Sequence, residues 1–515
     1  MKKVCCIIVL FLLYFPCLLK GEESYYFRKF GVENGLPQNT VSCILQDKQG
    51  FMWFGTKDGL SRYDGYTFKT FKHDKKDKNS IGNNFIWSIY QDESDAIWVG
   101  TDAGAYIYHP ETERFSHFDQ PATDGTMIRA GVNDMKCDRN GNLWLTAGWQ
   151  GIFRYDFEKK ELVSFREKAT ANAWCLCIDQ ENEVWIGTHG YGLSRYNQQH
   201  NRFESIRVPI ESEKNIQDDI YRIFQDNYND ILIGTANGGI RKISLIDKQL
   251  KPFPDEDDNR GALFVRDIMR RSDNELWIAT ESGIYICNTQ KQTVKNLRYE
   301  HADPHSLSDN AIYSIYTDRE GGIWIGTYFG GVNYYPPQYS PFKRFYPRND
   351  GIGLQGKRVR EFQQDASGGI WIGTEDAGLN YFNPINRTFK HFTSDGKPGS
   401  LAYSNIHGLL ADGDVLRVGT FAHGMNVIEI KTQRVIRYYK KTEDPNSLCD
   451  NNVFSICKDH SGNLWIGTIN GLNLYNPSND NFTKIAYPGN TFIYDTYSIS
   501  KTKSRMKDWK KARKR

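Results

Sequence analysis

Large aromatic and polar residues recur along this chain at positions where they could contact a ligand. The residues beside each position are mostly apolar, whereas the residue at the position itself changes from copy to copy. A position used only for packing would keep one residue type, so this variation indicates binding. Aromatic faces stack on the C–H faces of sugar rings, and polar groups hydrogen-bond their hydroxyls. The series, spaced by about 45 residues as in repeat proteins, is Ser42, Trp87, Asn133, Trp174, Tyr221, Arg266 and Tyr313.

A second set of candidate residues follows a phrase close to W-I-G-T. Loops on a rigid scaffold are where binding residues concentrate. Several of these loops carry aromatic residues or histidine: Trp149, His189 with Tyr191, Tyr328 with Phe329, and Phe421 with His423. We therefore predict a site for an oligosaccharide or another small ligand that combines both sets, apart from Ser42 and the loop of Phe421 and His423. No cofactor and no metal site is predicted.

The spacing of these residues comes from an internal repeat of the whole chain. The Trp of W-I-G-T, or its replacement, marks ten copies: Trp53, Trp98, Trp144, Trp185, Leu232, Trp277, Trp324, Trp371, Arg417 and Trp465. A period in this range is typical of a propeller, solenoid or array. Each copy contains four short runs of β-branched and aromatic residues separated by turn residues, as in "NTVSCILQD", "FMWFGT", "LSRYDG" and "FKTFKHD". Such runs predict four antiparallel strands and hence the blades of a β-propeller.

In a four-stranded meander, the start of the first strand and the end of the second lie at the same edge. Both candidate sets should therefore meet on one face of the ring. The alternative is that these large side chains only narrow the axial channel. Arg266 is the most informative residue for choosing between a ligand site and channel packing. A charge at the channel entry must be paired, solvated or bound to a ligand.

The expected fold is all-β, a seven-bladed β-propeller followed by an incomplete second propeller of about three blades. We assign residues 1–21 to a signal peptide or N-terminal anchor, because a basic start precedes an apolar stretch. Residues 22–340 form the first propeller, completed by "YYFRKFG" (25–31) returning to the seventh blade. Residues 341–485 form the partial second propeller, in which Arg358, Arg360 and Glu361 either serve the second ring or pair with each other. Residues 486–515 hold a truncated blade start and a basic tail.

Charge and cysteine content exclude several functions. The net charge of +3 includes a tail, residues 501–515, with nine Lys or Arg against one Asp, and Lys2, Lys3 and Lys20. Without them the repeats carry 3 − 8 − 3 = −8, which argues against nucleic-acid binding. The seven cysteines after residue 21 do not suggest a disulfide framework, and Cys175 with Cys177 alternate as core residues.

An enzyme acting on polysaccharide is a weaker alternative. Asp134 and Asp267 are an acid/base pair that could flank a sugar bond. With 62 acidic residues in the chain, however, some pair always qualifies. No nucleophile elbow, H-E-x-x-H motif or phosphate-binding glycine loop is present in the sequence. A protein-interaction platform is the third possibility.

The repeat, D-x-x-G followed by W-I-G-T-x-x-G-L-x-x-Y-D, resembles the two-component regulator propeller repeat. The best matches are "DKQGFMWFGTKDGLSRYDG" (47–65) and "DHSGNLWIGTINGLNLYN" (459–476), and the resemblance covers roughly residues 24–485. It implies the periplasmic sensor region of a hybrid two-component histidine kinase, with two seven-bladed propellers, a β-sandwich, a membrane span and a kinase, and a homodimer at full length. This sequence departs from that pattern near Asn490 and is expected to be truncated there. Membrane association would then come only from the N-terminal segment or from the missing C-terminal region, and the chain itself should neither autophosphorylate nor cleave polysaccharide.

Overall fold

A computed structural model of the protein describes residues 25–206, 219–226, 230–245, 250–253, 263–337, 345–348 and 350–485. The predictions for residues 1–21 and 486–515 lie outside this part. Apart from two single 3-10 turns, η1 (Val32–Asn34) and η2 (Lys168–Thr170), every described element is a strand, which confirms the all-β prediction. The chain divides into two compact units, the first comprising Met1–Glu300 and His305–Tyr339 and the second His301–Pro304 and Ser340–Arg515. No described helix is long and apolar enough to cross a lipid bilayer.

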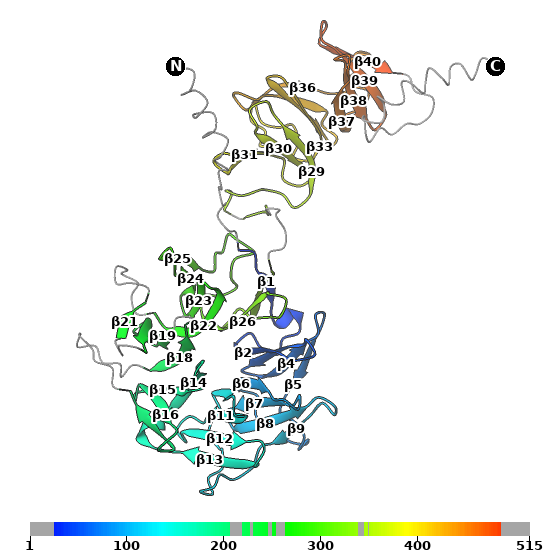
Figure 1. Cartoon of the computed structure of the whole chain (residues 1–515). Coiled ribbons are helices and arrows are strands. Elements are labelled where there is room, and N and C mark those ends of the chain that lie inside the picture. The colour runs from blue at the N-terminus through cyan, green and yellow to red at the C-terminus, as the bar shows by residue number, and fades with distance from the viewer. Residues whose placement is uncertain are drawn as a thin grey trace, which may run out of the picture. The chain divides into compact units, whose positions relative to one another are not determined.

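Six sheets of the first unit are meanders of four consecutive antiparallel strands (Figure 1). The first three are β2 (Val41–Gln46), β3 (Met52–Thr56), β4 (Gly59–Tyr63) and β5 (Phe68–Phe71); β6 (Ile86–Gln91), β7 (Ile97–Thr101), β8 (Gly104–His109) and β9 (Arg114–His117); and β10 (Asp134–Cys137), β11 (Asn142–Thr146), β12 (Ile152–Asp156) and β13 (Glu161–Phe165). The next three are β14 (Ala173–Ile178), β15 (Val184–Thr188), β16 (Leu193–Asn197) and β17 (Arg202–Ser205); β18 (Ile220–Gln225), β19 (Asp230–Thr235), β20 (Ile240–Ser244) and β21 (Leu250–Pro252); and β22 (Val265–Ser272), β23 (Glu275–Thr280), β24 (Gly283–Asn288) and β25 (Thr293–Leu297).

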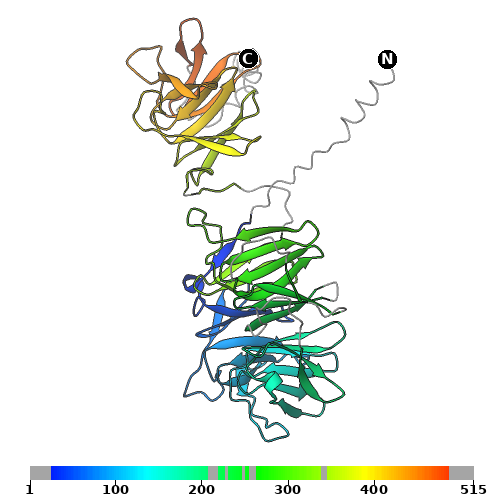
Figure 2. The same ribbon diagram turned by 90° about the vertical axis from the view of Figure 1, so that its left-hand side faces the viewer.

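The seventh sheet of this unit joins the two ends of its sequence. It consists of β26 (Ile312–Thr317), β27 (Ile323–Thr327), β28 (Val332–Tyr335) and, from the start of the chain, β1 (Arg28–Phe30). Arg28 lies opposite Tyr334, and Phe30 lies opposite Val332. The predicted return of the N-terminal strand is therefore confirmed, and Figures 1 and 2 show this blue strand beside the green strands that end the unit.

The second unit contains three further sheets of the same kind. They are β29 (Val359–Gln364), β30 (Ile370–Thr374), β31 (Leu379–Asn383) and β32 (Thr388–Phe392); β33 (Ile406–Asp412), β34 (Val415–Thr420), β35 (Met425–Glu429) and β36 (Arg434–Tyr439); and β37 (Val453–Lys458), β38 (Leu464–Thr468), β39 (Gly471–Asn476) and β40 (Asn481–Ile485).

The repeated glycine of W-I-G-T is explained by contacts between neighbouring sheets. A Cβ atom on Gly55 would lie 2.8 Å from Cγ2 of Ile86 in the next sheet, closer than real Cβ atoms approach. The same clash recurs at Gly326, whose Cβ would lie 2.7 Å from the backbone oxygen of Val41. The first strands of successive sheets contact each other from β2 to β26, and β26 in turn contacts β2. Sheet seven therefore packs on sheet one as the others pack on their neighbours.

The repeated tryptophan ties each second strand to the turn before it. In seven of the copies the indole Nε1–H donates to the aspartate six residues earlier, at the start of the turn, as from Trp53 to Asp47 at 2.7 Å and from Trp371 to Asp365 at 2.9 Å. Where leucine replaces tryptophan, at Leu232, Arg270 of the following sheet pairs with the buried Asp226 instead. Each arrangement leaves the buried carboxylate with a donor, as burial requires.

Replacing Trp371 with phenylalanine should destabilise the second unit by about 1–3 kcal/mol, because Asp365 is left buried without its indole donor. Urea denaturation of the full chain measures the effect. Ser367→Ala is the matched control, since it removes a hydrogen bond from an exposed side chain to the same carboxylate. Equal effects of the two substitutions would show that the indole bond is not important for stability.

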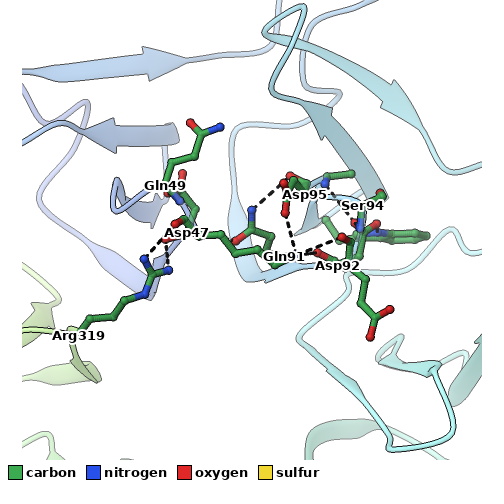
Figure 3. A network of polar contacts seen from close by, with 11 residues as sticks. Asp47, Gln49, Gln91, Asp92, Ser94, Asp95 and Arg319 are labelled. Carbon is green, nitrogen blue, oxygen red and sulfur yellow. Dashed lines mark hydrogen bonds and ion pairs between the residues drawn. The ribbon is translucent and has the colours of Figure 1, made fainter.

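Polar contacts also join neighbouring sheets at the turns between their first and second strands, as Figure 3 shows around Asp47, Gln91 and Arg319. The backbone N–H of Lys48 donates to the side-chain oxygen of Gln91 in the next sheet, at 2.7 Å. Arg319, in the turn of the seventh sheet, donates through its backbone N–H to Gln46 of the first at 2.8 Å, and its guanidinium bonds the backbone oxygens of Asp47 and Lys48. In both cases a backbone N–H donates to a glutamine side chain of the neighbouring sheet. The first and seventh sheets are thus joined in the same way as the first and second.

Candidate functional site

The candidate residues of the first strands sit at β-bulges. The register shifts by one residue between Val41 and Cys43 and at the matching place in five other sheets of the first unit. A bulged residue has no partner on the neighbouring strand, and its side chain is re-aimed. The bulged residues are Ser42, Trp87, Trp174, Tyr221, Arg266 and Tyr313. The third sheet differs, because Asn133 lies immediately before β10 and no shift occurs there.

Each bulge lies beside the first residue after the W-I-G-T strand of the same sheet, fifteen positions later. Trp87 Nε1 donates to Asp102 at 2.8 Å, and the rings of Trp174 and His189 stack with centroids 4.4 Å apart. Arg266 donates to Glu281, and the rings of Tyr313 and Tyr328 are 5.1 Å apart. The hairpin register causes this, because Val41 pairs with Thr56 and so brings residues 42 and 57 to one edge. The two predicted sets therefore meet.

Aromatic contacts continue from sheet to sheet. Trp87 of the second sheet contacts Trp174 of the fourth with centroids 5.3 Å apart, and Trp174 contacts Tyr221 of the fifth at 5.4 Å. Tyr221 contacts Phe264, which precedes the sixth sheet, at 4.5 Å. One line of rings thus crosses four sheets.

Arg266 continues this line as a cation held between aromatic faces. Its guanidinium lies 3.7 Å from the centroid of Phe264, 4.9 Å from that of Tyr221 and 4.4 Å from that of Tyr313. It also donates to the Tyr313 hydroxyl at 3.2 Å and to Glu281 through Nε at 3.2 Å. The charge is therefore paired and stacked, which is how a half-buried arginine is stabilised.

Lys57 closes the line into a circuit. Its ammonium group lies 4.1 Å from the ring centroid of Tyr328, donates to the Tyr328 hydroxyl at 2.7 Å, and lies 5.6 Å from the ring centroid of Phe85. Phe85 stacks on Trp87 at 4.4 Å, where the line began. We call this circuit the aromatic belt; its members are Lys57, Phe85, Trp87, Trp174, His189, Tyr221, Phe264, Arg266, Tyr313 and Tyr328.

The belt is half-buried, and this burial keeps His189, Tyr221 and Tyr313 uncharged near neutral pH. Burial, reinforced by the charge of Arg266 and opposed by Asp219, lowers the pKa of His189. Burial also raises the pKa of Tyr221 and of Tyr313, although Arg266 opposes this. Nε2 of His189 is buried and has no hydrogen-bond partner among the described residues. The belt therefore offers aromatic faces, phenol hydroxyls and a neutral imidazole.

Four predicted residues lie outside the belt. Trp149 and Phe329 are 68% and 73% exposed, and Tyr191 is also exposed. Phe329 contacts Tyr328 with centroids 4.5 Å apart, whereas Asn133, Trp149 and Tyr191 make no ring contact with the belt in the described part of the chain. Seven of the eleven predicted residues therefore lie together in the belt, and their role in binding a ligand stays a prediction: Trp87, Trp174, His189, Tyr221, Arg266, Tyr313 and Tyr328.

Other belt residues were missed by the sequence prediction. Phe85 and Phe264 lie two positions before Trp87 and Arg266, and alternate residues of a strand share a face. That spacing was the signal that would have identified them. Lys57 of the belt follows the W-I-G-T strand in a short loop, as do Asp102 and Glu281, which bind belt residues. The sequence prediction considered only aromatic residues and histidine in these loops, so it did not select the charged ones.

The two carboxylates considered for hydrolysis bind backbone amides. Asp134 accepts from the N–H of Leu176 in the next sheet at 2.9 Å. Asp267 accepts from the N–H of Ile315 at 3.0 Å and pairs with Arg222 at 2.8 Å. Both carboxylates thus connect neighbouring sheets.

Comparisons with known proteins identify the repeat. Four segments, residues 35–58, 80–103, 306–329 and 447–470, match the family model described as two component regulator propeller. The prediction of two-component regulator propeller repeats is confirmed by these matches. A curated relative, histidine kinase P4 of Formosa agariphila, is 44% identical over 64 residues; this match covers 12% of the chain and only 5% of that protein.

Solved structures extend the similarity to most of the chain. The extracellular domain of a protein assigned as the hybrid two component system BT3049 of B. thetaiotaomicron is 25% identical, with a TM-score of 0.64 over 90% of this chain and 67% of that one. The extracellular domain of BT4673 from the same organism is 21% identical, with a TM-score of 0.51 over 90% of this chain and 68% of that one, and shows the same fold. The chain thus resembles the extracellular sensor domains of such systems.

Proposed function

We propose that this chain, which carries two-component regulator propeller repeats, is an exported region of a hybrid two-component sensor and binds a ligand outside the cytoplasm. The similarity to the extracellular domain of BT3049 over 90% of the chain supports this proposal. The response to the ligand would be carried by other parts of the system, because the described residues consist of propeller-like sheets.

The aromatic belt is the ligand site that we propose, and an oligosaccharide is the proposed ligand. The observation that carries this is the contrast between repeated and variable positions. The indole-to-aspartate bond recurs from sheet to sheet, whereas the bulge residues differ and still join into one circuit. Rings that stack on C–H faces, beside hydroxyl, imidazole and carboxylate groups, suit a neutral sugar.

A screen of the full chain against immobilised neutral and acidic oligosaccharides tests the proposal. We expect saturable binding to one class of glycan, with the part of the binding that belongs to the belt lost when belt residues are substituted. A chain that captures proteins but no glycan would instead be an interaction platform, for which the exposed Trp149, Tyr191 and Phe329 are the candidate contacts. Release of shorter saccharides during the screen would favour the hydrolase alternative.

We further propose that the first unit is a complete seven-bladed propeller and the second a three-bladed part of another. The contact of β26 with β2 supports closure of the first. In the second, Val359 is 39% exposed, whereas its counterparts Val41 and Ile406 are fully covered by a preceding sheet. The first sheet of the second unit thus lacks such a cover among the described residues.

Limited proteolysis should leave a resistant core of residues 22–340 and digest residues 341–485. The reason is that an uncovered blade face opens more readily than one packed between two neighbours. Mass spectrometry of the fragments checks the boundary. A single resistant, monomeric fragment covering residues 22–485 would point to one ten-bladed ring instead.

A further inference from the structure

The bulge that builds the aromatic belt recurs in all three sheets of the second unit. The register shifts between Val359 and Glu361, between Ile406 and Gly408, and between Val453 and Ser455. The bulged residues are therefore Arg360, His407 and Phe454. Their side chains are re-aimed as in the first unit, so a second set of variable residues faces one edge.

Phe454 contacts both of the other two residues. The guanidinium of Arg360 lies 5.9 Å from the ring centroid of Phe454, and the rings of His407 and Phe454 are 4.9 Å apart. Arg360 also pairs through Nη1 with Glu375 at 2.8 Å, fifteen positions later, as Arg266 pairs with Glu281. The arginine charge is therefore already compensated, which disfavours a strongly anionic ligand.

Two polar atoms of this cluster lack hydrogen-bond partners. Nε of Arg360 and Nδ1 of His407 are buried, and neither has a partner among the described residues; His407 is only 7% exposed. Arg266, by contrast, donates from Nε to Glu281. Buried polar groups are almost always satisfied, so these two atoms, which lie in one cluster, are available to hydrogen-bond a ligand.

His407 is a neutral imidazole near neutral pH. Burial and the charge of Arg360 lower its pKa to about 4, against the opposing effect of Glu375. With the proton on Nε2, Nδ1 accepts a hydrogen bond, while Nε–H of Arg360 donates one. A single hydroxyl group satisfies both, because it accepts and donates at once.

The loop over this cluster is held in an unusual conformation. Ala422 has φ +61, which non-glycine residues rarely adopt. Phe421 beside it is 42% exposed, and its ring lies 5.7 Å from that of His407. Strained backbone of this kind clusters at ligand sites, and Phe421 places an exposed aromatic ring beside His407.

We propose a second saccharide site in the second unit, formed by Arg360, Glu375, His407, Phe421 and Phe454. One ligand hydroxyl bridges Nε–H of Arg360 and Nδ1 of His407, Glu375 accepts from another, and the sugar C–H face packs on Phe421 and Phe454. This site is separate from the aromatic belt and does not rest on the function proposed for it.

Calorimetric titration of the full chain with named saccharides tests the proposal. The probes are the neutral cello-, xylo-, manno- and arabinohexaoses, with hexagalacturonate as the acidic comparison, each to about 10 mM. A Trp87→Ala, Trp174→Ala, Arg266→Ala variant, in which the belt is removed, should still bind a neutral probe saturably. Adding Arg360→Lys or His407→Phe should weaken that binding at least tenfold. Arg360→Lys keeps the charge opposite Glu375 but loses the Nε–H donor, so a folding defect and a site defect are distinguished by comparing its melting curve.

Three results would overturn the second site. They are no saturable neutral binding in the belt variant, binding of hexagalacturonate alone, and unchanged binding after both Arg360→Lys and His407→Phe. When His407→Phe is the only substitution in the chain, the saccharide binding that remains is binding at the belt. The two sites can therefore be tested separately.

Discussion

Trp174→Ala is expected to weaken saccharide binding at the aromatic belt about thirtyfold, or ~2 kcal/mol, the usual loss when a central aromatic contact is truncated. Trp174 is the residue that contacts Trp87, His189 and Tyr221 together, so its removal opens the circuit. Its ring is only half-buried, and the melting temperature should fall by no more than about 4 °C. Calorimetric titration with the glycan retained in the screen measures the change.

Trp149→Ala is the matched control, because it removes the same side chain from an exposed loop outside the belt. It should change affinity less than twofold. Removal of Trp87, Trp174 and Arg266 together should abolish belt binding with the first unit still folded. If Trp149→Ala has the larger effect, or if the triple variant unfolds, the belt residues serve packing rather than binding.

Gly326→Val should destabilise the first unit by about 3 kcal/mol or more. The added side chain would clash with backbone atoms, which cannot move aside as a flexible side chain could. The added Cβ atom would lie 2.7 Å from the backbone oxygen of Val41 and 2.4 Å from Oγ of Ser314. The valine side chain would therefore push the seventh sheet away from the first. Urea denaturation, followed by tryptophan fluorescence, measures the destabilisation.

Ala279→Gly is the control for this substitution. Ala279 holds the same place in the sixth sheet, where the structure accommodates a methyl group in the core. Its replacement should cost about 1 kcal/mol, the usual penalty of a strand glycine with no methyl to pack. A Gly326→Val variant as stable as the original chain would show that sheets one and seven do not pack together.

The repeat was predictable because each copy meets the same requirements. Trp53 and Asp47 must satisfy each other, and Gly55 must leave room for Ile86, so these residues recur in the sequence. The bulge residues were recognisable for the opposite reason, since Trp87 and Arg266 occupy the same place without sharing a type. Periodicity therefore separates residues that hold the sheets together from the variable bulge residues that we propose as ligand contacts.

The remaining features depend on three-dimensional neighbours. The sequence could not show that Trp87 meets Trp174 across an intervening sheet, or that Lys57 joins Tyr328 to Phe85. Trp149 was predicted from its loop position, and the structure places its exposed ring outside the belt. Asp134 resembled a catalytic acid, yet its partner is the backbone of Leu176. In the second unit Arg360 was noted only together with Arg358 and Glu361, and the orphaned atoms of Arg360 and His407 follow from neighbours that the sequence does not show.

A crystal structure of the chain with the glycan retained in the screen tests the proposed sensing function most directly. We predict a sugar ring against the belt, with its C–H face on Trp174 or Trp87 and hydroxyls bonded to the polar groups beside Arg266, including Glu281. A glycan bound only elsewhere, with the belt unchanged from its unliganded arrangement, would contradict the assignment of the belt as the sensory site.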